Sequence, residues 1–222
     1  MAALTTTSYA ILGLLSVKPW TSYDLAQQMD RSLGRMWPRA TSKIYEEPKK
    51  LVAHGMAHAR EESVGRRKRT LYSITAKGRR ALAAWLDEPG EGPVLEFEQM
   101  LKVFFSDSGT KTGTLATLAR TRRWAEERSA ESLAVGTGYL QEEGPFGERL
   151  AQLELTSRFL TDFYALVGDW ATWATEVVDR WPRDPATAVA DPANIRETVR
   201  RARQAAGGSG SPNRIHGTPG GD

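Results

Sequence analysis

The fold class is decided by residues 55–78, which read GMAHAREESVGRRKRTLYSITAKG. Beyond Gly55 the apolar residues change from helical to alternating spacing, which predicts one short strand over residues 57–62 and a second over residues 69–75. The turn between these strands carries four consecutive cations at or beside its tip: Arg66, Arg67, Lys68 and Arg69. The segment therefore predicts a two-stranded hairpin with a basic tip, followed by a helix that Thr75 caps.

Three helical segments are expected before the hairpin, because apolar residues recur there at helical spacing. They cover residues 6–15, 22–33 and 41–54, and Gly34 and Gly55 end the second and the third. Polar and mostly basic residues cover the rest of the third helix and the turn before it: Arg39, Ser42, Lys43, Tyr45, Lys49 and Lys50. The third helix is therefore predicted to have a basic outer face.

A proline inside the third predicted helix bears on its path. Pro48 removes one backbone hydrogen bond and clashes with the preceding turn, so we expect a kink or a restart of the helix there. The expected kink or restart leaves open which of Lys49 and Lys50 faces outward. Tyr45 has two interpretations: it is a core aromatic beside Ile44, or its hydroxyl contacts a phosphate.

Three helices, a strand, a basic hairpin tip and a second strand follow one another in the order of a winged helix-turn-helix. In such a domain the third helix enters the major groove, and the wing tip reaches phosphates or the minor groove. The residues expected to pair with phosphates are Lys43, Lys49, Lys50, Arg66, Arg67, Lys68 and Arg69. Arg39 and Ser42, at the entering end of the helix, are better placed for base edges. The sequence therefore predicts binding of double-stranded DNA.

The charge of the chain is divided unevenly along its 222 residues. Residues 1–90 carry 15 Lys and Arg against 8 Asp and Glu, whereas residues 91–222 carry 15 against 19. A basic module joined to a mildly acidic one favours an anionic partner for the first, most often nucleic acid. The composition is otherwise that of a globular protein, with 40% hydrophobic and 26% charged residues.

Catalytic and metal-binding functions find little support in the residues. The chain has no cysteine, only three histidines and no glycine-rich phosphate loop, so we expect no enzyme, no metal site and no cofactor. The apolar run over residues 9–15 is too short to span a membrane, and no basic segment precedes it. We therefore expect a cytoplasmic protein with no membrane partner.

The C-terminal part is predicted to be helical. Residues 87–94 are rich in Pro and Gly and read as the junction between two domains, while residues 95–105 form an apolar helix that we expect to be mostly buried. Two long helical stretches follow, over residues 111–143 and 146–181. The second carries an apolar stripe far longer than one average helix, which favours packing against a second copy of the chain.

The fold expected is thus mainly α: a winged helix-turn-helix over residues 1–88, with a two-stranded β wing, and a helical dimerisation and effector domain over residues 89–185. Residues 186–222 are expected to be mostly disordered, with one possible short basic helix over residues 191–205. Trp124, Trp170 and Trp173 either line an apolar pocket for a small-molecule effector or simply pack the helices together.

The N-terminal part resembles the PadR family of transcriptional regulators. The resemblance rests on the order and spacing of residues 9–15, 21–25, Ile44-Tyr45 with Leu51 and Gly55, the wing 65–69, residues 72–79, Leu82 and 85–86. Residues 100–105 look like the opening of the family's helical C-terminal domain. The resemblance implies a homodimer, an inverted-repeat operator, usually repression, and often release by a small molecule.

Two other functions remain open. A winged helix also serves as a protein-interaction adaptor, in which case its basic face docks on an acidic partner instead of DNA. An enzyme is the weaker alternative, because the residues that catalysis needs are missing from the sequence.

Overall fold

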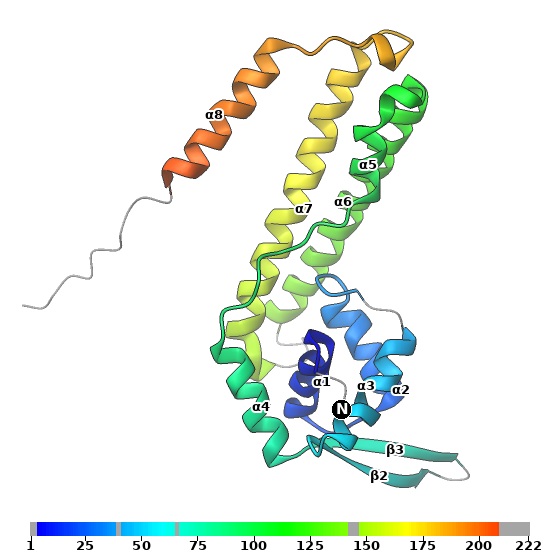
Figure 1. The fold of residues 1–222 in the computed structure, drawn as a ribbon, viewed down its shortest axis with the longest axis vertical. Coiled ribbons are helices and arrows are strands. Elements are labelled where there is room, and N and C mark those ends of the chain that lie inside the picture. The colour runs from blue at the N-terminus through cyan, green and yellow to red at the C-terminus, as the bar shows by residue number, and fades with distance from the viewer. Residues whose placement is uncertain (1–3, 39–40, 65–66, 142–146, 209–222) are drawn as a thin grey trace, which may run out of the picture. The chain divides into compact units, whose positions relative to one another are not determined.

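The computed structural model of the chain describes residues 4–38, 41–64, 67–141 and 147–208. The chain divides into two compact units, Met1–Val94 and Leu95–Asp222 (Figure 1). Both units are built mainly from helices, as the sequence predicted, and the only β-structure in the described ranges is one small sheet in the first unit. Within those ranges no helix is both long enough and apolar enough to cross a membrane.

The helices of the first unit begin where the sequence supplies capping side chains. Thr5 and Ser8 form a reciprocal capping box at the start of the first helix, and the hydroxyl of Thr21 accepts a hydrogen bond from the backbone N–H of Asp24 at the start of the second. The elements are α1 (Thr6–Val17), α2 (Ser22–Gln28), a π-helical turn η1 (Met29–Leu33), α3 (Thr41–Ala53) and α4 (Ala76–Asp87). Their shared core contains the fully buried side chains Ile11, Leu12, Leu15, Leu25 and Leu51.

The sheet has three antiparallel strands in the order β1-β3-β2. The strands β2 (Ala57–Val64) and β3 (Arg67–Ile74) form the predicted hairpin, which is longer than expected at its tip end. The additional strand β1 (Trp20–Thr21) pairs with β3. Two residues are too few to show the alternation that marks a strand in a sequence, which is why β1 was not predicted.

Helix α3 runs through Pro48 without an interruption, so the predicted restart at this residue is wrong. The missing N–H leaves the carbonyl of Ile44 without its helical donor, but the proline ring is fully buried. Burial of the ring in the core offsets the lost hydrogen bond. The direction of each α3 side chain then follows from regular helical spacing.

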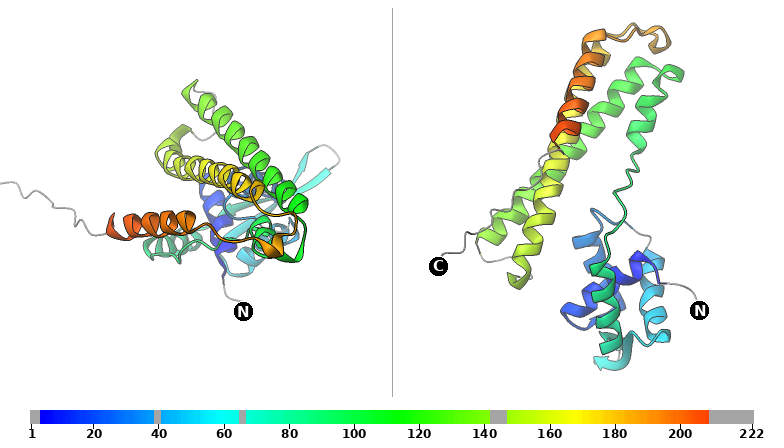
Figure 2. Two further views of the ribbon diagram at one scale, coloured as in Figure 1. Left: turned by 90° about the horizontal axis from the view of Figure 1, so that it is seen from above. Right: turned by 60° about the vertical axis from the view of Figure 1, so that its left-hand side comes forward.

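The second unit is dominated by a long helical hairpin. Helices α6 (Lys111–Leu140) and α7 (Leu150–Asp179) pack along each other (Figure 2). Leu118, Ala174 and Val178 form the buried cluster of this hairpin. Its other elements are α5 (Glu98–Phe104), the 3₁₀ turns η2 (Ser106–Ser108), η3 (Gly147–Arg149) and η4 (Pro185–Thr187), and α8 (Pro192–Gly208). The predicted basic helix after residue 190 is therefore present as α8, and residues 209–222 of the segment expected to be disordered lie outside the described residues.

The apolar segment before α6 is a correction to the sequence analysis. Residues 95–105 were expected to be mostly buried, yet Leu101, Phe104 and Phe105 are 59%, 76% and 61% exposed. The pattern shows that these residues favour burial, but it does not show that the covering surface belongs to the same chain. Helix α5 packs on α6 with one side and leaves the other side uncovered.

Candidate nucleic-acid interface

Helix α3 has one face in the core and one face in solvent. Ile44, Glu47 and Leu51 are buried, and their three- and four-residue spacing places them on one side of the helix. The opposite side is exposed and carries Ser42, Tyr45, Glu46 and Lys49. Lys43 is also exposed, at the flank of this outer face. The outer face of α3 is therefore a polar surface of the size that enters a major groove.

The structure separates the two adjacent lysines of α3. Lys49 is exposed on the outer face, whereas Lys50 is half-buried and its ammonium lies 3.5 Å from the carboxylate of Glu47. The charge of Lys50 is therefore partly neutralised by Glu47. Lys49 is the better candidate for a phosphate contact.

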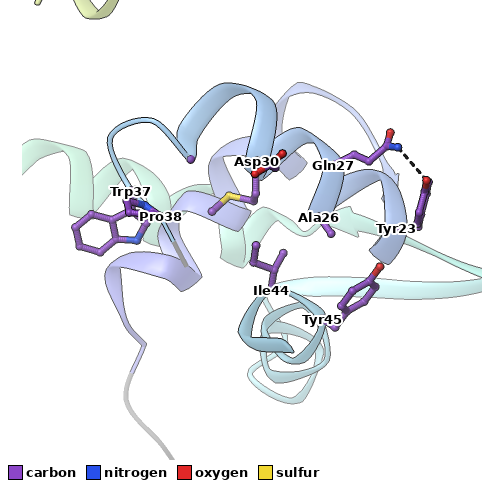
Figure 3. Close-up of a pocket in the computed structure, with 10 residues that line it drawn as sticks. Tyr23, Ala26, Gln27, Asp30, Trp37, Pro38, Ile44 and Tyr45 are labelled. Atoms are coloured by element: carbon purple, nitrogen blue, oxygen red, sulfur yellow. Dashed lines mark hydrogen bonds between the residues drawn. The ribbon is translucent and has the colours of Figure 1, made fainter. Parts of the chain in front are cut away.

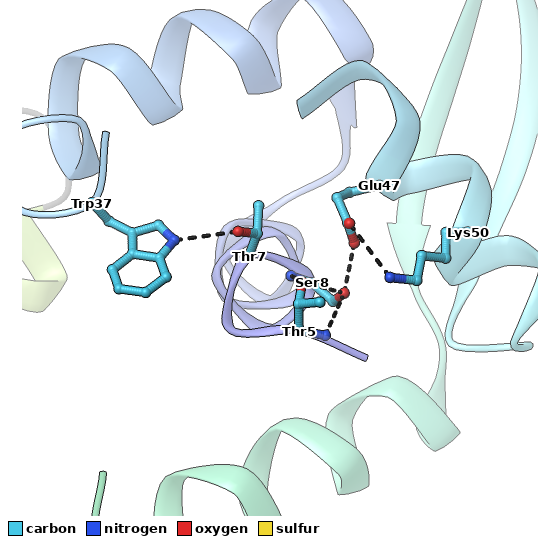
Figure 4. A network of polar contacts seen from close by, with 6 residues as sticks. All are labelled: Thr5, Thr7, Ser8, Trp37, Glu47 and Lys50. Carbon is cyan, nitrogen blue, oxygen red and sulfur yellow. Dashed lines mark hydrogen bonds and ion pairs between the residues drawn. The ribbon is translucent and has the colours of Figure 1, made fainter. Parts of the chain in front are cut away.

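The buried carboxylate of Glu47 ties α3 to α1 (Figure 4). Its Oε2 accepts a hydrogen bond of 2.6 Å from the hydroxyl of Ser8, which is fully buried and belongs to the capping box of α1. On the other side of α1 the indole N–H of Trp37 donates to Thr7 at 3.3 Å. A charged hydrogen bond in a buried position fixes the rotation of α3 about its axis, and with it the side chains that face outward.

The wing is joined rigidly to the end of α3. Gly55 has a φ of +69°, and the backbone N–H groups of Gly55 and Met56 donate to the carbonyls of Val52 and Leu51 in a Schellman motif. The ammonium of Lys77 donates to the carbonyl of His54 at 2.8 Å. These contacts hold the start of β2 and the start of α4 against the last turn of α3. The wing and α3 are therefore held next to each other by these contacts.

The basic residues of the wing differ in their surroundings. Lys68 is exposed and lies opposite Ser63, next to the tip. Arg69 donates to the carboxylate of Glu62 at 3.0 Å, and Arg60 contacts the same carboxylate. The hydrogen bonds from Arg69 and Arg60 hold the pKa of Glu62 below its usual value. Among the wing cations that the structure describes, Lys68 carries the least compensated charge.

Part of the predicted site lies outside the described residues. Arg39 and Arg66 are in this group, and of Arg67 only the backbone, in β3, is described. The remaining predicted residues lie on two neighbouring features, the outer face of α3 and the flank of the wing. These are Ser42, Lys43, Tyr45, Lys49, Lys68 and Arg69, with Lys50 turned inward.

A hollow of about 420 Å³ lies between α2, η1 and α3 (Figure 3). Ala26, Met29 and Ile44 line its apolar part, and Tyr23 and Tyr45 lie at its rim. Tyr23 accepts a hydrogen bond of 2.9 Å from the amide of Gln27. Tyr45 is 38% exposed, so it is a surface residue and not the core aromatic of the first interpretation.

The three tryptophans considered for an effector site have separate surroundings. Trp124 on α6 makes an edge contact with Tyr164 at a ring distance of 5.5 Å, whereas Trp170 on α7 contacts Phe97 at 6.1 Å. Trp173 is 45% exposed. The contacts of Trp124 and Trp170 pack helices together, and the hollow of the first unit includes none of the three.

Two residues that shape this surface were not predicted from the sequence. Glu46 is an exposed acid in the middle of the outer face of α3, and its carboxylate is an acceptor of the kind that pairs with cytosine N4. Glu47 is its buried neighbour. The two adjacent acids look alike in the sequence, and only the phase of the helix separates them.

Comparisons with known proteins identify a family for the first unit. Residues 11–84 match the family described as transcriptional regulator PadR-like. The negative transcriptional regulator PadR of Bacillus subtilis is 34% identical over 99 residues, which is 44% of this chain and 54% of that relative. The chain spans about half the length of the curated relatives that it matches.

Solved structures share the fold over a longer range. Bacillus subtilis PadR in complex with operator DNA has a TM-score of 0.68 at 22% identity, covering 78% of this chain and 99% of that one. The same protein in complex with p-coumaric acid has a TM-score of 0.62 at 22% identity, covering 79% and 100%. The fold and the family resemblance predicted from the sequence are confirmed. Residues 11–84 of the chain form a domain of the transcriptional regulator PadR-like family.

Proposed function

We propose that the chain is a cytoplasmic transcriptional regulator that binds double-stranded DNA in a sequence-specific way. The observation that carries this is the outer face of α3, polar and exposed, with the wing fixed beside it by the motif at Gly55. In this function Ser42 and Glu46 read base edges in the major groove, while Lys43, Lys49 and Tyr45 contact phosphates. The wing, through residues 66–69, contacts the flanking backbone.

The proposal includes a homodimer. Helix α5 exposes Leu101, Phe104 and Phe105 together, and adjacent large apolar side chains of this kind mark a surface that another protein covers. Two copies related by a two-fold axis would place two α3 helices about 34–36 Å apart, in successive major grooves on one face of the duplex. The operator would then be an inverted repeat.

Repression and effector control follow as finer parts of the proposal. The relative in Bacillus subtilis is named a negative regulator, and a structure of it holds p-coumaric acid. A flat apolar molecule would be bound by aromatic faces, for which Trp124 and Trp173, both partly exposed, and Trp170 remain the candidates. No catalytic activity belongs to this function.

The experiment is a binding selection with the full chain. Duplexes bound by the protein are enriched from a random pool and sequenced. An enriched inverted repeat with half-sites one helical turn apart supports both the DNA-binding function and the dimer. Enrichment of a single half-site contradicts the dimer. A pool that stays random contradicts sequence-specific binding and favours the adaptor, whose acidic protein partner would then compete with DNA for the same basic surface.

A further inference from the structure

Helix α8 is amphipathic but has no broad packing partner among the described helices (Figure 1). Ile195 and Val199 are 55% and 43% exposed, and with Ala202 they form one apolar line along the helix. Arg196 and Arg203 are spaced seven residues apart on one flank of this line. Most of the stability of a helix in a protein comes from packing of its amphipathic face, so the apolar line of α8 needs a covering surface.

The outward side of α7 has a complementary pattern. Leu155, Phe159, Leu166 and Trp173 are 74%, 62%, 64% and 45% exposed, at heptad-like spacing. Three exposed acids share this side and are themselves seven residues apart: Asp162, Asp169 and Glu176. We call these seven residues the outer stripe of α7. The stripe lies away from the buried side chains that pack against α6, such as Val167 and Ala174.

The handedness of the two patterns selects an orientation. Each residue turns an α-helix by about 100°, so the flank on which a side chain lies can be worked out from its number. When each helix is viewed from its N-terminus, the arginines of α8 lie clockwise of its apolar line. The acids of α7 lie anticlockwise of its apolar line. Opposite flanks of this kind meet when two helices pack in parallel, as e and g positions do in a parallel coiled coil. Antiparallel packing would place the arginines on the flank that lacks the acids.

The chain's own connection between the helices allows only antiparallel packing. The ammonium of Lys111 donates to the carbonyls of Asp179 and Trp181 at 2.8 Å each, and Pro185 is buried, so the chain is held at the end of α7. Only residues 188–191 then separate η4 from α8, and so short a connection returns a helix antiparallel to the one before it. The α7 of a second copy has no such restriction.

We propose that α8 is a clasp that packs in parallel on the outer stripe of α7 in a second copy of the chain. The inference rests on the proposed dimer and adds to it a segment outside residues 11–84. The register is set by bringing Arg196 next to Asp162 and Arg203 next to Asp169. In this register Ile195 lies opposite Leu166, and the small Ala202 lies opposite the large Trp173. Asp169 forms no ion pair within the described ranges, so its charge is available to Arg203.

Engineered cysteines test the placement, because the chain has none of its own. Full-length Ile195→Cys and Leu166→Cys chains, carrying different tags, are co-expressed and mildly oxidised. We expect a disulfide-linked heterodimer from the pair and no linked species from either variant alone. The double variant in one chain should link between chains. A disulfide within one chain would overturn the clasp, and so would the absence of a disulfide in a protein that sediments as a dimer. A protein that is monomeric at all concentrations would overturn the proposed dimer as well.

Charge reversal supplies a second test on the intact chain. Arg203→Glu should raise the dimer dissociation constant roughly fivefold, and Asp169→Arg in addition should restore most of it. Gln204→Glu, on the far face of α8, is the matched control and should leave dimerisation unchanged. If Arg203→Glu weakens DNA binding while the dimer dissociation constant stays the same, α8 contacts DNA phosphates and the clasp is refuted.

Discussion

The hydrogen bond between Ser8 and Glu47 should be one of the strongest single contacts in the first unit. The Glu47 side chain is nearly buried, and its carboxylate accepts from the Ser8 hydroxyl at 2.6 Å. A buried hydrogen bond to a charged group contributes about 1.5–3 kcal/mol. Ser8→Ala also removes the acceptor of the capping box of α1, which is worth about 1 kcal/mol. The local opening free energy should therefore be about 2.5–4 kcal/mol lower in Ser8→Ala than in the unchanged chain.

A double-mutant cycle isolates the contact from the cap. Ser8→Ala, Glu47→Ala and the combined variant are compared by native-state amide hydrogen exchange of peptides from residues 41–53, which reports local opening free energies. In the Glu47→Ala background Ser8→Ala should cost only about 1 kcal/mol, so the coupling energy should be about 1.5–3 kcal/mol.

Glu46→Gln is the control for this cycle. Glu46 is the exposed neighbour of Glu47 on the same helix, and its replacement should change protection by less than about 0.5 kcal/mol. A coupling energy below about 0.5 kcal/mol between Ser8 and Glu47 would refute the claim that this contact fixes the rotation of α3.

Three further outcomes follow from the geometry. Lys49→Ala should reduce the slope of log affinity for DNA against log salt concentration by about 1, whereas Lys50→Ala should change this slope less. Fluorescence anisotropy over a salt series measures both slopes, and equal slopes for the two variants would contradict the assignment of Lys49 to a phosphate. Gly78→Ala should destabilise the first unit more than Gly55→Ala in urea unfolding. A Cβ at Gly78 would clash with the carbonyl oxygen of Met56, whereas a Cβ at Gly55 would meet only the Lys77 side chain, at 4.0 Å, with a strained φ. Hydrogen bonds from Arg200 and Arg201 lower the pKa of the Glu197 carboxyl to about 2, so its ion pairs should persist as the pH falls through 4.5 and be lost only near pH 2. Titration followed by NMR measures this midpoint, and a midpoint near pH 4.5 would contradict the ion pairs.

The winged helix could be predicted from the sequence because each of its parts leaves a local signal. Thr75 caps α4 as expected, and Gly55 takes the left-handed conformation that ends α3. The strand at Trp20 could not be predicted, since its conformation is set by pairing with Tyr72, more than fifty positions away in the chain. Long-range pairing of so short a segment has no periodicity to detect.

The candidate site was predictable in composition but not in orientation. The basic residues of α3 and of the wing tip were identified, but Arg60 in β2 was not, and the sequence did not show which of these cations are partly neutralised. Lys50 pairs with Glu47, and Arg69 pairs with Glu62 across the hairpin. The phase of α3 depends on the continuation of the helix through Pro48, which local rules argued against. The exposed side of α5 was missed for a different reason, because an apolar pattern does not identify its partner.

The central claim is that the outer face of α3 and the wing together read a specific DNA sequence. The most direct test is the affinity of the full chain for the duplex enriched by selection, compared at one fixed salt concentration with a duplex of the same composition in shuffled order. If α3 and the wing read the base sequence, the chain should bind the selected duplex at least about 1,000-fold more tightly than the shuffled one. Equal affinity for the two duplexes would contradict it.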